Sequence, residues 1–146
     1  MRTMLLAMAA LIGMTATEAA TPPQLEVRLV VPCQPGDQTF AVVGGAEELC
    51  LDKAAMLDAS GVVKVERYPV LPKAVMEISE AASARFYEMT YGKSGERVGF
   101  VFNGRLIFVP VIVDAVKSKE LQISLKNDPD DIDALVAAFP GTPAAQ

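Results

Sequence analysis

The stretch between Arg97 and Val109 constrains the fold most strongly, because it contains the clearest turn signal of the chain. Asn103-Gly104 separates two apolar runs, 97–102 and 106–109. An Asn-Gly pair tolerates the positive φ that both central residues of a two-residue hairpin turn require. Both runs are apolar at consecutive positions, which is typical of strands covered on two faces. The sequence therefore predicts a β-hairpin in the centre of a sheet.

Further strands are predicted on either side of this hairpin. Residues 25–30 alternate between apolar and polar side chains, which places Glu26 and Arg28 on one face. Residues 49–57 are expected to be the end of a strand that passes into a short helix. The remaining strands are expected over 39–43, 62–68, 74–78 and 121–125.

Two segments have helical periodicity and start signals. Ser79 is a good N-cap for a first helix that ends near Gly92. Asp128 is the expected cap of a second helix, with Pro129 at its first position. The apolar stripes consist of Ile78, Ala82, Phe86 and Met89 in the first helix and Ile132, Leu135, Val136 and Phe139 in the second. These elements predict an α+β fold, in which two main helices pack on an antiparallel-rich, mixed β-sheet.

The N-terminal residues 1–20 have the layout of a secretory signal peptide, with one basic residue, an apolar run and small residues at the end. The apolar run is roughly a dozen residues long, whereas a membrane-spanning helix needs about 20. An uncleaved N-terminal anchor is the alternative. We expect cleavage and export to the periplasm, a single domain over 21–141, and a flexible tail over 142–146.

Cys33 and Cys50 are the only cysteines of the chain, and an oxidising compartment favours a disulfide between them. The turn signal at 35–37 lies between the expected strands 27–31 and 39–43, so a hairpin of these strands would bring the cysteines together. A redox-active or metal-binding pair is the alternative, although Cys-x-x-Cys spacing is absent.

The composition narrows the chemistry further. The chain has no His, which excludes Ser-His-Asp and Cys-His catalysis and the usual zinc and non-haem iron sites. The formal net charge of -5 argues against a duplex nucleic acid as a partner, because phosphates require a basic face. Carboxylate catalysis needs no His and stays open. Its candidate residues are Glu47, Glu48, Asp52, Glu66, Glu77 and Asp114. None has a recognisable catalytic frame, and we expect no enzyme, no metal and no cofactor.

The second half of the chain resembles a known family. Its order from Val75 to Phe139 is strand, helix, hairpin, strand and helix. This order and several short motifs resemble the head subdomain of the first periplasmic domain of SecD and SecDF, accessory subunits of the Sec protein translocase. The motifs are Ile78-Ser79-Glu80-Ala81-Ala82, Phe86, Met89-Thr90, Val101-Phe102-Asn103-Gly104-Arg105-Leu106-Ile107, Pro110-Val111-Ile112 and Gln122-Ile123-Ser124. Residues 25–30 are similar to the strand that opens that region.

The resemblance implies a fold and a tendency to contact extended polypeptide, with no catalytic residues to carry over. SecD proteins have several transmembrane helices that this chain lacks after its signal peptide, so motor activity is not implied. In that family Gly residues surround the Gln-Ile-Ser strand, whereas Lys119-Glu120 and Leu125-Lys126 flank it here. The resulting hypothesis is a non-enzymatic envelope module that binds an extended or secretory polypeptide through a strand edge. A small periplasmic ligand-binding protein, a carboxylate-dependent hydrolase and a structural partner in an envelope complex are the alternatives.

Overall fold

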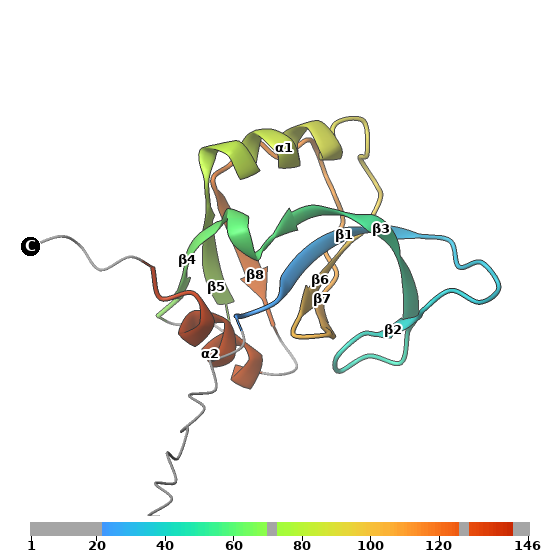
Figure 1. Ribbon diagram of the computed structural model, residues 1–146, viewed down its shortest axis with the longest axis horizontal. Coiled ribbons are helices and arrows are strands. Elements are labelled where there is room, and N and C mark those ends of the chain that lie inside the picture. The colour runs from blue at the N-terminus through green and yellow to red at the C-terminus, as the bar shows by residue number, and fades with distance from the viewer. Residues whose placement is uncertain (1–21, 70–72, 126–128, 142–146) are drawn as a thin grey trace, which may run out of the picture.

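A computed structural model of the chain describes residues 22–69, 73–125 and 129–141 (Figure 1). The predicted signal peptide, the tail over 142–146 and the expected cap Asp128 lie outside these residues. The described residues form eight strands, two α-helices and one 3₁₀ turn, as expected for an α+β fold. Their bounds are β1 Leu25–Val31, β2 Phe40–Ala41, β3 Glu48–Asp58, the 3₁₀ turn Ala59–Gly61, β4 Val62–Arg67, β5 Lys73–Ile78, α1 Glu80–Thr90, β6 Val98–Phe102, β7 Arg105–Phe108, β8 Glu120–Ser124 and α2 Pro129–Ala138.

One half of the molecule is a five-stranded sheet in the order β2-β3-β1-β6-β7, in which all neighbouring strands are antiparallel. The two outer edges also meet, because the residues that follow β2 reach β7: Val42 forms a parallel bridge with Leu106, and the Val43 N–H donates to the Leu106 carbonyl at 3.0 Å. An odd number of strands closes only with one parallel seam, and this bridge is that seam. The sheet is therefore a small closed barrel.

The other half is layered. Its three-stranded antiparallel sheet has the order β4-β5-β8, and Figure 1 shows α1 across the top of the view and α2 beside β4 and β5. The side chains of Ala74, Met76 and Ile78 alternate with more exposed positions along β5, so one sheet face is buried and the other faces solvent. Ile132 and Leu135 of α2, and Phe139 just after it, pack on the buried face.

The core consists of two apolar clusters, of which the larger joins the two halves. The larger one joins the buried face of the layered half to β1 and β6, where Val98, Phe100 and Phe102 contribute. The smaller one lies inside the barrel and contains Val101 and Leu106. All five residues of β6 are buried, which confirms the prediction that this strand is covered on two faces. The barrel covers one face, and the layered half covers the other.

The predicted local signals around the hairpin and the first helix are confirmed. Asn103 and Gly104 have φ values of 48° and 83°, as a two-residue hairpin turn requires. The Ser79 hydroxyl oxygen accepts a hydrogen bond from the Ala82 N–H at 3.1 Å and so caps α1. No helix in the described part of the chain is long and apolar enough to cross a membrane.

Three sequence predictions are wrong. The β6–β7 hairpin does not lie in the centre of its sheet, because β7 is an outer strand. Residues 49–57 belong to β3, a single strand of 11 residues that pairs with β1 and β2, and no α-helix follows within them. The expected hairpin between 27–31 and 39–43 also does not form, because β3 lies between β1 and β2 in the sheet. The strand near 39–43 shortens to the two residues of β2. Pairing between strands distant in sequence overrides local preference in each case.

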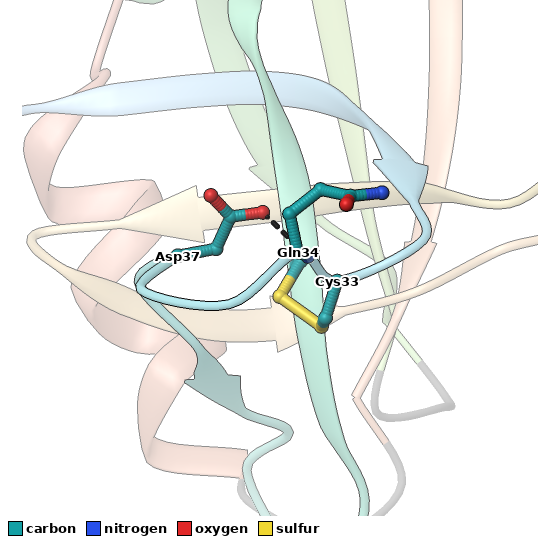
Figure 2. The surroundings of a disulfide bond; sticks show 4 residues. Cys33, Gln34 and Asp37 are labelled. Carbon is teal, nitrogen blue, oxygen red and sulfur yellow. Dashed lines mark hydrogen bonds between the residues drawn. A yellow bond between two sulfur atoms is a disulfide. The ribbon is translucent and has the colours of Figure 1, made fainter.

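Cys33 and Cys50 are joined by a disulfide, with Cα atoms 5.2 Å apart (Figure 2). Cys33 follows β1, whereas Cys50 lies within β3 and is paired across the ladder with Val31. The loop between them turns at Gly36, where the Asp37 carboxylate accepts a hydrogen bond from the Gln34 N–H at 2.8 Å. The bond therefore fastens the β1–β2 loop to the barrel wall.

Candidate binding groove along β8

The outer edge of β8 pairs with no other strand among the described residues. At the start of the β5–β8 ladder the Ile78 N–H donates to the Lys119 carbonyl at 2.8 Å. In an antiparallel pair the hydrogen-bonded positions alternate, so Leu121 and Ile123 direct their N–H and C=O groups toward β5. Those of Glu120, Gln122 and Ser124 point away from the sheet. Donors and acceptors therefore line the free side of β8.

Only part of this edge is occupied. The Ser118 hydroxyl accepts from the Glu120 N–H at 3.0 Å and donates to the Glu120 carbonyl at 2.9 Å. Within the described ranges no hydrogen bond reaches the outward backbone groups of Gln122 and Ser124. These two residues are about 7 Å apart along the strand. They leave a short ladder to which an extended chain can add.

The opposite edge of the same sheet is closed at its centre. The Val65 N–H points outward from β4 and donates to the Phe139 carbonyl at the end of α2, at 2.9 Å. Arg67, the next outward position, pairs with Asp133 of α2 at 2.6 Å. A second strand therefore has room to add at β8 and is obstructed by α2 at β4.

Two hollows border β8, one near its start and one near its end. The first has a volume of about 270 Å³, is bounded by Glu120–Gln122 on the β8 side, and is lined mainly by apolar side chains. The second, of about 650 Å³, is lined by Ser124 and Leu125 on the β8 side. The Phe108 side chain of β7 lines both hollows. The apolar lining of the first hollow includes Phe86, Phe100, Phe108, Ile112, Val113 and Val116. We call this region, with the outward backbone of Gln122 and Ser124, the β8 groove.

Exposed apolar side chains border the first hollow. Val113 is 83% exposed and Val111 is 54% exposed, and both belong to the segment that connects β7 to β8. Their backbone is held by hydrogen bonds, since the Ser94 hydroxyl donates to the Val113 carbonyl at 2.7 Å and the Ile112 N–H donates to the Glu96 carbonyl at 2.7 Å. This rim presents apolar surface beside a strand edge.

Charged pairs line the second hollow. Arg97 donates two hydrogen bonds to the Glu47 carboxylate, at 3.0 and 3.1 Å. These bonds hold the pKa of Glu47 below its ordinary value and raise the pKa of Arg97. The buried Asp131 carboxylate accepts from Arg105 at 2.7 Å. The polar lining is therefore largely engaged in pairs within the protein.

The solvent-facing side of the three-stranded sheet carries a row of three charged side chains, one positive and two negative. Lys64, Glu77 and Glu120 lie directly opposite one another across β4, β5 and β8. Lys64 Nζ is 3.6 Å from Glu77 and 3.0 Å from Glu66, and the hydrogen bond with Glu66 raises the pKa of Lys64. The carboxylate of Glu120 has no ion-pair partner among the residues described. The row ends at the groove with two adjacent negative charges.

The acids considered for catalysis are dispersed. Asp52 and Asp114 accept hydrogen bonds from the N–H groups of Ala54 and Ala115, and Glu47, Glu66 and Glu77 face Arg97 or Lys64. Asp131 is the one buried carboxylate in the described part of the chain, and it pairs with Arg105. Those residues also contain no group of three or more potential metal ligands. The arrangement therefore offers no facing pair of buried carboxylates for acid–base work.

Some residues singled out from the sequence line the β8 groove, namely Gln122 and Ser124 of the Gln-Ile-Ser motif and the acids Glu47 and Asp114. Others lie elsewhere. Cys33 and Cys50 staple the barrel, and Asn103 and Gly104 form its β6–β7 turn. The sequence predicted the strand at 121–125 but did not identify its free edge. The available signal was the polar residues Gln122 and Ser124 alternating with buried apolar ones, together with exposed valines just upstream.

No family model and no curated protein matches this chain. Solved structures that share its fold include two of SecDF. One is of SecDF, a membrane component that enhances protein export: it is 17% identical with a TM-score of 0.62, over 85% of this chain and 65% of that chain. The other is of SecDF in a super-membrane-facing form, 17% identical with a TM-score of 0.60, over 84% of this chain and 19% of that chain. The chain has a SecDF-like fold and spans less than two thirds of either structure.

Proposed function

We propose that this chain, which shares its fold with part of SecDF, is a non-enzymatic module of the periplasm that binds an extended polypeptide in the β8 groove. The observation that carries the proposal is the free backbone of Gln122 and Ser124 beside an apolar hollow of about 270 Å³. Main-chain hydrogen bonds supply affinity in strand addition, and pockets for alternate side chains supply selectivity.

The pleat of the sheet supports this mode of binding. A residue opposite Gln122 on the added strand shares the solvent-facing side with Gln122, whereas residues opposite Leu121 and Ile123 point toward the core side. That side is where Phe86, Phe108 and Val116 line the first hollow. An added strand therefore buries every second side chain against apolar surface.

The fold supports a role connected with protein export. The similar structure SecDF is a component that enhances protein export, and the similarity extends over 85% of this chain. The Cys33–Cys50 disulfide suits an oxidising compartment outside the cytoplasm. We propose that this chain corresponds to the head subdomain of the SecD family. The polypeptides that it binds are then secretory polypeptides that have not yet folded.

The proposal is tested by titrating the purified protein with a secretory polypeptide kept unfolded by reduction of its disulfides. Gln122→Pro removes the outward N–H of Gln122 while the ladder bonds of Leu121 and Ile123 to β5 remain. We expect this substitution to weaken binding about tenfold. Arg67→Pro, at an outward position on the opposite edge, is the matched control and leaves the affinity unchanged.

A second pair of variants tests the hollow. Val113→Asp places a charge on its exposed rim and is expected to weaken binding several-fold, whereas Val63→Asp, at a 43% exposed position of β4, does not. Absence of binding at high micromolar concentration contradicts the proposal. So does equal weakening by Gln122→Pro and Arg67→Pro. Concentration-dependent dimerisation that Gln122→Pro abolishes, without polypeptide binding, assigns the edge to a second copy of the chain instead.

A further inference from the structure

We infer that the β8 groove selects extended segments in which an apolar residue alternates with a basic one, and that the Glu120 carboxylate attracts the basic side chain. This inference rests on the proposed function, because it specifies the polypeptide that the groove accepts. The observations that carry it are the charge row across the sheet, the free carboxylate at its end, and the pleat that fixes where each partner side chain points.

The charge row is incomplete at β8. Glu77 and Glu120 are directly opposite each other, and Glu77 already faces Lys64 on its other side. Like charges directly opposite each other across strands are unfavourable. Glu120 is exposed, and none of the described residues supplies a cation for it. A strand that adds to the free edge of β8 can place a positive side chain beside this negative pair. The charges across the sheet would then be balanced at that end.

The backbone fixes where that positive side chain has to be. Ser118 occupies the outward N–H and C=O of Glu120, so an added strand pairs with Gln122 and Ser124. The partner residue opposite Gln122 lies on the solvent-facing side, diagonal to Glu120. Diagonal neighbours are about 7–8 Å apart, within reach of the long side chains of Lys and Arg. The basic residue is therefore expected opposite Gln122.

The positions next to it are expected to be apolar. Partner residues opposite Leu121 and Ile123 direct their side chains toward the core side of the sheet, where Leu121 lines the first hollow together with Phe86 and Phe108. A charge at those positions would lose its hydration without a partner. The net charge of -5 on the chain further favours a basic segment over an acidic one. The class of ligand is thus an amphipathic strand with a basic solvent-facing side.

Short blocked peptides with valine at the inward positions and Lys, Thr or Glu at the central outward position test the inference. Binding to the purified protein is measured by isothermal titration. We expect the Lys peptide to bind about two- to fivefold more tightly than the Thr peptide, and the Glu peptide to bind more weakly than both. Glu120→Gln is expected to remove the preference for Lys over Glu, and Glu120→Lys to reverse it.

Glu66→Gln is the matched control, because it changes the net charge equally but removes a carboxylate of β4 that faces Lys64. It is expected to leave the preference intact. Equal affinity for the Lys and Glu peptides, with Gln122→Pro still weakening both, overturns this inference and leaves the proposed function standing. If Glu66→Gln and Glu120→Gln reduce the preference for the Lys peptide equally, the inference is also overturned, because the net charge of the protein then determines the preference. Absence of binding by all three peptides and by unfolded polypeptide overturns both.

Discussion

The barrel and the layered half differ in whether the edges of their sheets are paired or covered. In the barrel the outer edges meet where Val42, just after β2, bridges Leu106 of β7, so the sheet has no long free edge. In the layered half α2 covers the centre of β4, whereas β8 keeps the outward groups of Gln122 and Ser124 unpaired within the described residues. Closed barrels remove edges, and open sheets have to cover or use them.

This difference assigns separate tasks to the two halves. The barrel is closed and stapled by Cys33–Cys50, so its strands present side chains rather than free backbone. The layered half supplies most of the large core and one usable strand edge. The four variants that follow probe how far this division holds, and they are arranged from the largest expected loss of stability to the smallest.

Leu135→Ala is expected to have the largest effect, because this α2 side chain is fully buried in the layered half. Loss of a buried Leu costs about 2–5 kcal/mol of unfolding free energy, since transfer and cavity terms add. Urea denaturation measures it, and Val63→Ala, at a 43% exposed position, serves as the control. A loss below about 1 kcal/mol would mean that α2 contributes little to the core, and the layered half would then be less well packed than described.

Removal of the disulfide by Cys33→Ser with Cys50→Ala should cost about 3 kcal/mol, because the closed loop has a sequence separation of 17. Hydrogen exchange localises the effect: amides of 31–50 are expected to lose protection first, and those of β5 to lose less. If protection falls equally in β5, the staple acts on the whole molecule, and the halves are not separable in stability.

Gly99→Ala tests the packing inside the barrel. A Cβ atom at Gly99 would lie 2.8 Å from Leu106 Cδ1 and 2.9 Å from Leu51 Cδ2, so neighbouring side chains have to shift. Overpacking of this kind costs about 1–3 kcal/mol. Gly45→Ala is the matched control, since its nearest neighbour would be Val42 Cβ at 3.5 Å, an ordinary contact. Equal thermal melting of the two variants would contradict a tightly filled barrel.

Glu47→Gln should have the smallest effect, and one that depends on pH. Arg97 lowers the pKa of Glu47 in the folded state, so the pair stabilises the fold above pH about 4.5, the ordinary value for the group. That contribution is lost as the pH falls through the lower folded-state pKa. The wild-type protein and the variant are thus expected to differ slightly near neutral pH and to converge in acid. Glu48→Gln is the control, and the same convergence there would indicate a general charge effect.

Local signals predicted much of the fold. The Ser79 cap and the Asn103-Gly104 turn depend on a few neighbouring residues, so they could be read directly from the sequence. Residues 53–57 contain good helix formers, and this composition misled the interpretation of β3. Pairing of Arg28 with Ala55, beside a bulge, holds this segment extended. Such pairing joins residues far apart in sequence, and single-segment periodicity contains no information about it.

The turn at 35–37 shows the same limit. The turn exists, with Gly36 at a φ of 87° and the Gln34–Asp37 hydrogen bond. The chain after it returns to β3 rather than to β1, however, so the predicted hairpin was wrong while the predicted pairing of the cysteines was right. A short turn signal predicts that the chain changes direction. Which strand the following residues pair with depends on the rest of the sheet.

The sequence alone determined the α+β class, the hairpin that turns at Asn103-Gly104, the helix positions and the alternation that buries Leu121 and Ile123. Each of these depends on the side chains of one continuous segment. Only the tertiary structure decided that the five-stranded sheet closes while β8 retains a free edge beside Phe108. An edge is a property of strand order, because a backbone group is free only when no neighbouring strand reaches it. The candidate groove therefore follows from how distant segments assemble.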